Sequence, residues 1–176
     1  MPKIGLLSDS HGRALTTRRA VQILLEAGAQ VLLHMGDIGS MEVIDQLVVP
    51  ADESGKAIDV HLVFGNVDWD RQPMGRYAQH LGITVSDPVG TLDLPAENAS
   101  ESPRQLIFLH GDDTQAMVSA LAAKPAYLCH GHSHQARNDR EGATRIINPG
   151  ALFRAQNYTV AILDTDSDEV TFFPVE

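Results

Sequence analysis

Three apolar segments near the start of the chain each end in a glycine or serine beside an aspartate or asparagine. The segments are residues 4–7, 31–33 and 60–63, and each has the length and composition of a buried β-strand. Helical spacing of apolar residues follows the first two, over about 13–27 and 40–47. Alternating strands and helices predict an α/β fold, in which function collects beyond the carboxyl ends of the strands. The oxygen-bearing side chains at these ends are Asp9, Asp37, Asn66 and Asp68.

The second half of the chain repeats this pattern, with histidines at the strand ends. His110 follows an apolar segment at 106–109, and the sequence Gly-His-Ser-His at 131–134 follows another at 127–129. The acidic run at 164–168 lacks the glycine and distal glutamate of a calcium loop, so we interpret it as a hairpin turn. Other expected elements are a helix at 73–80, a helix at 114–123, strands at 83–85, 89–94, 159–163 and 170–173, and polar loops at 51–56 and 95–103.

The strand ends supply a set of side chains suited to divalent metals. Asp9 and His11 are two positions apart, and in extended chain such side chains point the same way. Taken alone, the pair is weak evidence for a metal, because a helix cap and a surface histidine would give the same sequence. Seven donors exceed the four ligands of one zinc and match two metals that share a bridging carboxylate. Because cysteine is absent from the set, Mn, Fe, Zn or Ni is favoured over a thiolate site. The donors are Asp9, His11, Asp37, Asn66, His110, His132 and His134.

Charge and composition disfavour several classes of partner and indicate the cellular location. Thirteen basic residues against 23 acidic ones leave a net charge of −10, which disfavours extended nucleic acid and anionic membranes. The single cysteine, Cys129, excludes an internal disulfide framework and is expected to be buried. No apolar run approaches 18 residues and no signal-peptide pattern begins the chain, so a cytoplasmic location is expected. The oligomeric state stays open, with a homodimer among the alternatives.

Five motifs, in this order, resemble those of the calcineurin-like metallophosphoesterases. Within that family the chain is most similar to the small single-domain bacterial and archaeal phosphodiesterases. The resemblance implies one domain over residues 1–176. It also implies an α/β fold in which a mixed two-sheet β-sandwich is flanked by helices. The motifs are Asp9-x-His11, Gly36-Asp37, Gly65-Asn66-x-Asp68, His110-Gly111 and Gly131-His132-Ser133-His134, and Asn148-Pro149-Gly150 matches a further family stretch.

The resemblance also implies a ligand set and a reaction. Asp37 would bridge two divalent ions, for which manganese is expected and nickel, iron and zinc are alternatives. The reaction would be hydrolysis of a small phosphodiester by a hydroxide between the metals. Asp37, Asn66 and Asp68 are the predicted catalytic residues, and Asp68 would orient a ligand histidine or support its loop. By resemblance, one metal is held by Asp9, His11 and His134, and the other by Asn66, His110 and His132.

One position departs from the larger members of the family. Many of them have a histidine after the glycine and asparagine, where it is proposed to protonate the leaving group, whereas this chain has Val67. Hydrolysis is still expected, without an assigned general acid. The alternative function is a catalytically weak interaction scaffold like the retromer subunit of this fold. A third reading, a nuclease, shares the chemistry but conflicts with the net charge.

Overall fold

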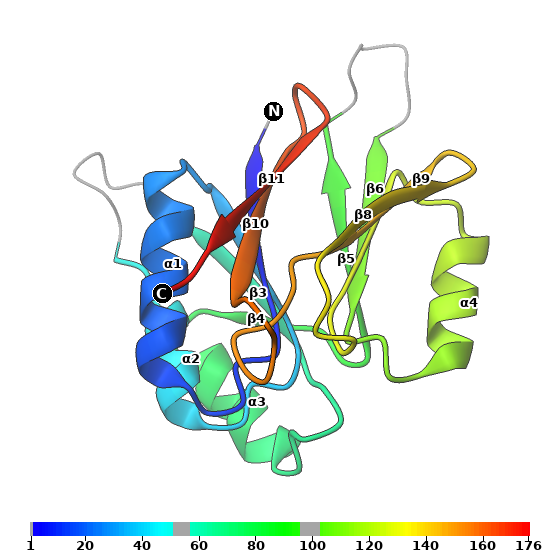
Figure 1. Cartoon of the computed structure of the whole chain (residues 1–176). Coiled ribbons are helices and arrows are strands. Elements are labelled where there is room, and N and C mark those ends of the chain that lie inside the picture. The colour runs from blue at the N-terminus through cyan, green and yellow to red at the C-terminus, as the bar shows by residue number, and fades with distance from the viewer. Residues whose placement is uncertain (1, 51–56, 96–102) are drawn as a thin grey trace.

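Two mixed β-sheets lie face to face, with helices on their outer sides (Figure 1). The computed structural model describes residues 2–50, 57–95 and 103–176. The first sheet has the strand order β11-β10-β1-β2-β3-β4, and the second has the order β5-β6-β7-β9-β8. The predicted α/β sandwich is confirmed. Its elements in chain order are β1 (Lys3–Leu7), α1 (Ala14–Glu26), β2 (Val31–Met35), α2 (Met41–Leu47), β3 (Asp59–Val63), α3 (Arg71–His80), β4 (Thr84–Val85), β5 (Val89–Leu94), β6 (Arg104–Leu109), α4 (Thr114–Ala122), β7 (Tyr127–His130), β8 (Arg137–Glu141), β9 (Thr144–Asn148), β10 (Thr159–Asp164) and β11 (Glu169–Pro174).

The layers follow from the alternation of side chains along each strand. In β1, Ile4 and Leu6 pack between the two sheets, whereas Leu7 packs toward the helices α1 to α3. Both faces of the central strands are therefore buried, which explains why these strands are continuously apolar rather than alternating. A smaller cluster, in which Ile107 and Leu128 meet Ala120 of α4, covers the outer face of the second sheet.

Parallel strand pairs bring the polar strand ends to one end of the sandwich. In the first sheet β1, β2 and β3 run parallel, so their carboxyl ends lie side by side. In the second sheet β6 and β7 run parallel to each other. Figure 1 shows the loops that follow these strands converging between the two sheets, on the side where α1 and α3 begin.

The sequence did not predict strand β8. All five of its residues are exposed and polar, and β8 pairs only with β9, at the edge of the second sheet. A strand without a buried face carries no hydrophobic alternation, so there was no signal to find. The acidic run forms the predicted turn between β10 and β11, but its Asp168 is not merely solvated. It accepts hydrogen bonds from Tyr127 and Arg140 and forms an ion pair with Arg145.

The remaining expectations concern loops and membrane segments. Residues 51–56 and 96–102, which include most of the two predicted polar loops, lie outside the described part of the chain. Within the described ranges, no helix has the length and apolar character required to cross a bilayer. Cys129 is buried in β7 and is a free thiol, as expected.

Candidate metal centre

The loop after β1 places Asp9 and His11 against each other, although not in the way predicted. The Asp9 carboxylate is fully buried, and its Oδ1 lies 4.0 Å from Nε2 of His11. The backbone between them is not extended, because Asp9 has φ 57° and His11 has φ 44°, both in the left-handed region. The extended backbone predicted for this pair is therefore wrong: the side chains converge because the loop turns after Leu7, where β1 ends.

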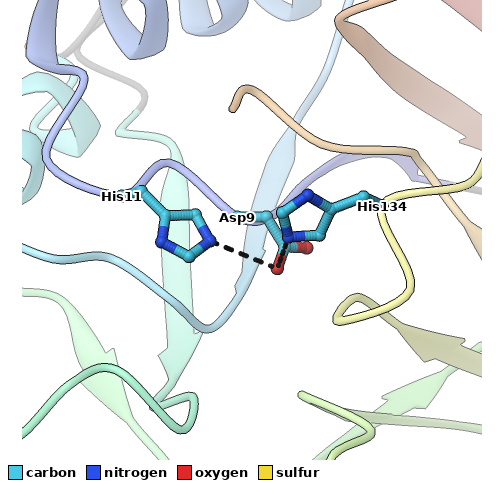
Figure 2. A group of neighbouring side chains, drawn as sticks. All are labelled: Asp9, His11 and His134. Carbon is cyan, nitrogen blue, oxygen red and sulfur yellow. Dashed lines mark ion pairs between the residues drawn. The ribbon is translucent and has the colours of Figure 1, made fainter. Parts of the chain in front are cut away.

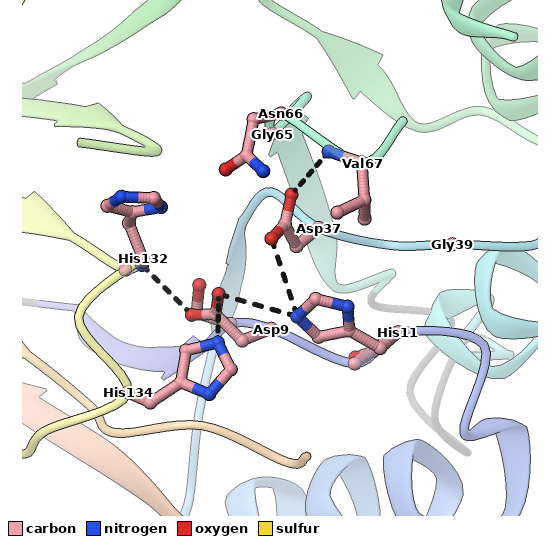
Figure 3. Close-up of polar contacts among 12 residues, drawn as sticks. Asp9, His11, Asp37, Gly39, Gly65, Asn66, Val67, His132 and His134 are labelled. Atoms are coloured by element: carbon pink, nitrogen blue, oxygen red, sulfur yellow. Dashed lines mark hydrogen bonds and ion pairs between the residues drawn. The ribbon is translucent and has the colours of Figure 1, made fainter. Parts of the chain in front are cut away.

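Asp37, at the end of β2, lies between two histidines. Its Oδ2 is 3.4 Å from Nε2 of His11, and its Oδ1 is 3.3 Å from Nε2 of His110. The backbone N–H of Val67 donates to Oδ1 at 3.0 Å (Figure 3). Burial alone would raise the pKa of Asp37, but the hydrogen bonds from His110 and Val67 lower it below its usual range. The carboxylate is therefore kept ionised, as a metal ligand must be.

His110, at the end of β6, has its ring orientation set by the backbone. Its Nδ1 lies 2.8 Å from the carbonyl oxygen of Met35, so this nitrogen donates and Nε2 is left to face the site. Nε2 is 3.1 Å from Oδ1 of Asn66 and also faces Asp37. Burial opposes a charge on the ring, yet Asp37 and the Met35 carbonyl raise the pKa of His110 above its usual range. Two oxygen atoms, one from Asn66 and one from Asp37, therefore lie close to the same ring nitrogen. A bound cation would stabilise this arrangement.

The loop after β7 delivers His132 and His134 from the second sheet. Nε2 of His134 lies 3.2 Å from Oδ1 of Asp9, as Figure 2 shows. The backbone N–H of His132 donates to the other oxygen of Asp9 at 3.1 Å. The His132 ring is exposed and lies 5.1 Å from the His110 ring, centroid to centroid. Asp9 thus ties the two sheets together at the site.

Sequence reasoning assigned no role to Asn148, which holds this loop in place. Its buried Nδ2 donates to the carbonyl oxygen of Gly131 at 2.8 Å and to Oγ of Ser133 at 3.0 Å. Asn148 stands at the end of an apolar strand, the same signal that identified Asp9 and Asp37. Its match to the family stretch marked the position, but only the fold shows what it contacts.

Asp68 contacts backbone rather than a histidine. Its Oδ1 accepts from the N–H of Gly39 at 2.8 Å, and its Oδ2 accepts from the N–H groups of Ile38 at 3.2 Å and Gly65 at 2.8 Å. Asp68 therefore joins the loop after β2 to the loop after β3.

Strained backbone concentrates at the predicted donors. Of the eight non-glycine residues with positive φ in the described ranges, five are predicted metal ligands. Each such conformation costs about 1–3 kcal/mol and persists only where the surrounding structure imposes it. So many strained residues in one place indicate a functional site, whatever their side chains are. The five are Asp9, His11, Asp37, His132 and His134.

The residues fit divalent metal ions. Two groups have their ligand atoms within 4.8 Å of one another: Asp9, His11 and His134 form one, and Asp9, Asp37 and His110 form the other. Oδ1 of Asp9 and Nε2 of His11 are buried without a hydrogen-bond partner, which is costly unless a cation lies between them. Of the predicted ligands, Asn66 lies against His110, while His132 stands outside both groups, beside that ring.

A methyl group added at Gly65 is expected to abolish tight metal binding. A Cβ at this position would lie 2.1 Å from Oδ1 of Asp37 and 2.4 Å from the Asp37 backbone nitrogen, so the carboxylate would have to move. We expect Gly65→Ala to cost more than the roughly 10–100-fold in metal affinity that follows loss of a ligand-orienting contact. Calorimetric titration with Mn²⁺ measures it. Gly75→Ala is the matched control, because its Cβ meets Phe64 at 3.6 Å, an ordinary contact. Equal affinities in the two variants would show that Asp37 does not need this space.

Comparisons with known proteins agree on one family. The model of the calcineurin-like phosphoesterase superfamily domain matches residues 2–168. The phosphodiesterase MJ0936 of Methanocaldococcus jannaschii is 22% identical over 171 residues, covering 95% of each chain. A solved structure of an archaeal phosphodiesterase has a TM-score of 0.79 at 20% identity, covering 98% of this chain and 99% of its own.

A Vps29 structure with zinc from Entamoeba histolytica also shares the fold. Its TM-score is 0.62 at 16% identity, with 98% of this chain and 91% of that one covered. At such identities the solved structures show the fold alone, whereas the family model spans nearly the whole chain. The chain therefore belongs to the calcineurin-like phosphoesterase superfamily.

Proposed function

We propose that this protein hydrolyses small phosphodiesters with two divalent metal ions held by the seven predicted donors. The observation that carries the proposal is the position of Asp37. Its two carboxylate oxygens face different histidines, His11 at 3.4 Å and His110 at 3.3 Å. A carboxylate that bridges two metal ions must direct one oxygen toward each group of donors, and Asp37 is placed to do so. Manganese is the proposed metal, and nickel, iron and zinc are the alternatives.

The chemistry divides between the metal ions and the chain. Two metal ions bound here would supply Lewis acidity and a water activated for attack on phosphorus. The residues of the chain keep this site in one geometry. Met35 fixes the tautomer of His110, and Asp68 holds the loop that carries Asn66. Asp9 accepts from the backbone of His132 and so keeps the loop of the second sheet in reach.

The proposed substrate class is a small phosphodiester rather than extended nucleic acid. A relative that matches along 95% of the chain is named a phosphodiesterase, which supports the diester. The net charge of −10 opposes the approach of a long polyanion, while a single phosphate can be held by local positive charge. A scaffold function is the weaker alternative, because all seven donors are present.

Metal-dependent hydrolysis of bis(p-nitrophenyl) phosphate tests the proposal. The purified protein is stripped with a chelator and reloaded separately with Mn, Ni, Fe or Zn. We expect the stripped protein to be inactive and at least one metal to restore turnover, with the diester preferred over p-nitrophenyl phosphate. Unchanged activity after stripping, or no activity with any of the four metals, would contradict the proposal.

The valine at position 67 predicts a steep dependence on the leaving group. Val67 cannot donate a proton, and both carboxylate oxygens of Asp68 are engaged by backbone N–H groups rather than directed at a substrate. A positioned general acid is typically worth about 10²–10⁴-fold for a poor leaving group. We therefore expect kcat/KM to fall sharply from aryl to alkyl diesters. Val67→His is expected to improve alkyl diesters by up to about 100-fold and aryl diesters little.

Kinetics across a series of aryl and alkyl diesters checks this expectation. Val67→Gln is the control, because it adds a polar side chain of similar reach that cannot act as an acid near neutral pH. A flat series for the unmodified protein would show that proton donation is supplied elsewhere. The same would follow if Val67→His and Val67→Gln had equal effects on every substrate.

A further inference from the structure

A surface groove opens directly from the first donor group. It has a volume of about 460 Å³, within the range of about 300–1,000 Å³ usual for small-molecule sites. His134 belongs both to this groove and to the donor group with Asp9 and His11. A substrate held at that donor group therefore has room to extend one ester arm into the groove. The polar side chains that line the groove are Ser133, His134, Gln135, Arg154, Gln156, Asn157 and Thr159.

Arg154 carries a positive charge in the lining of the groove, in a chain whose net charge is −10. No carboxylate lines it, and its other polar side chains offer amide or hydroxyl hydrogens. Within the described ranges no carboxylate forms an ion pair with Arg154, so its charge is uncompensated. By contrast, four other arginines are each paired with a carboxylate: Arg71, Arg137, Arg140 and Arg145.

Packing places the Arg154 guanidinium near the donor group. Its central carbon lies 5.0 Å from the centroid of the Phe153 ring, and that ring lies 4.9 Å from the His11 ring. Arg13 stacks on the same phenyl ring at 4.9 Å and adds a second positive charge. Arg154 itself has φ 47°, a conformation that few non-glycine residues adopt. The Arg154 guanidinium at the groove and the His11 ring of the donor group thus both lie against the Phe153 ring.

The surface beside His110 has the reverse character. A cavity of about 160 Å³ beside His110 is lined by Asp112 and Asp113. The arginine in that cavity, Arg71, is already paired with Asp87. An anionic arm would be repelled on this side and attracted on the other, so charge alone decides its direction.

We propose that the groove beside His134 binds the second ester arm of the substrate and that Arg154 selects an arm ending in an anionic group. A guanidinium suits a carboxylate or a phosphate, because its planar fork can bind two oxygens at once. The inference rests on the proposed diester hydrolysis, since it concerns the arm that is not expelled. It narrows the substrate class to diesters that carry a second negative charge.

Matched substrates test the selection by charge. Two phosphodiesters are compared: p-nitrophenyl 3-carboxypropyl phosphate and p-nitrophenyl 3-carbamoylpropyl phosphate. They have the same leaving group and nearly the same shape, and only the first carries the extra charge. A third diester, ending in a phosphonate, distinguishes phosphate-like ends from carboxylates. We expect kcat/KM to favour the charged arms by about tenfold, a modest factor because Arg154 is exposed. Arg154→Met should bring the ratio to about one, whereas Arg76→Met, an exposed arginine of α3 outside the groove, should leave it unchanged.

Binding separates this inference from the proposed function. The 3-carboxypropyl and 3-carbamoylpropyl phosphate products are titrated into the chelator-stripped protein and its variants by calorimetry. If no diester is hydrolysed but the charged product binds more tightly in an Arg154-dependent way, the hydrolase proposal fails and the groove assignment stands. If the diesters are hydrolysed without preference, or if Arg154→Met keeps the preference, the groove assignment is overturned and the hydrolase proposal stands.

Discussion

Replacing Asp37 by asparagine is expected to lower kcat/KM toward aryl diesters by at least about three orders of magnitude. One lost electrostatic contact in an active site costs about 10²–10³-fold, and Asp37 faces a histidine of each donor group. Its oxygens lie 3.4 Å from Nε2 of His11 and 3.3 Å from Nε2 of His110. The amide has the same shape but no charge, so it weakens both metal positions together.

The fold is expected to survive this change. The oxygen of asparagine can still accept the hydrogen bond that Val67 donates to Asp37 at 3.0 Å. Removing one of two buried carboxylates also relieves repulsion with Asp9 in the metal-free protein. Thermal unfolding followed by circular dichroism checks the fold, and Asp93→Asn, an exposed aspartate of β5, controls for the chemical change. An Asp37→Asn variant with turnover within tenfold of the unmodified protein would contradict the bridging role.

His110→Ala should remove one metal and leave the other. His110 contacts Asp37 and Asn66, and its ring lies beside His132, but it does not belong to the group of Asp9, His11 and His134. We expect turnover to fall by about 10²–10³-fold while one metal ion per chain remains bound. Elemental analysis gives the metal content, and diester hydrolysis gives the rate.

A control is needed because His110 is buried and its loss leaves a cavity. Asn66→Ala removes an exposed donor from the same metal without opening the core, so it should lower metal content and rate in the same direction. His80→Ala, at the exposed end of α3, should change neither. Near-normal hydrolysis by both His110→Ala and Asn66→Ala would show that these residues hold no catalytic metal.

Most of the fold could be predicted from sequence, because buried strands carry a clear signal. Residues Ile4 to Leu7 are continuously apolar since both faces of β1 are covered, and the same holds for the strands beside it. Strand β8 could not be predicted, because an exposed edge strand such as Arg137–Glu141 has no apolar face. A hydrophobic pattern in the sequence indicates which side chains are buried. An element that buries no side chain therefore cannot be predicted from such a pattern.

The residues of the candidate site could be predicted from the sequence, whereas their arrangement in space could be predicted only in part. The ends of strands identified Asp9 and Asp37, because carboxylates rarely follow buried strands by chance in such number. The left-handed turn that joins Asp9 to His11 leaves no mark in the sequence, since neither residue type requires that conformation. The contacts of Asn148 and Asp68 likewise depend on loops distant in the chain, which only the folded arrangement brings together.

Counting metal ions tests the central claim most directly. The protein is saturated with manganese, freed of excess ion by gel filtration and analysed by plasma mass spectrometry, and the same sample is assayed for diester hydrolysis. We expect two ions per chain in the active protein and fewer than one in Asp37→Asn. One ion or none per chain in a sample with full hydrolytic activity would contradict it.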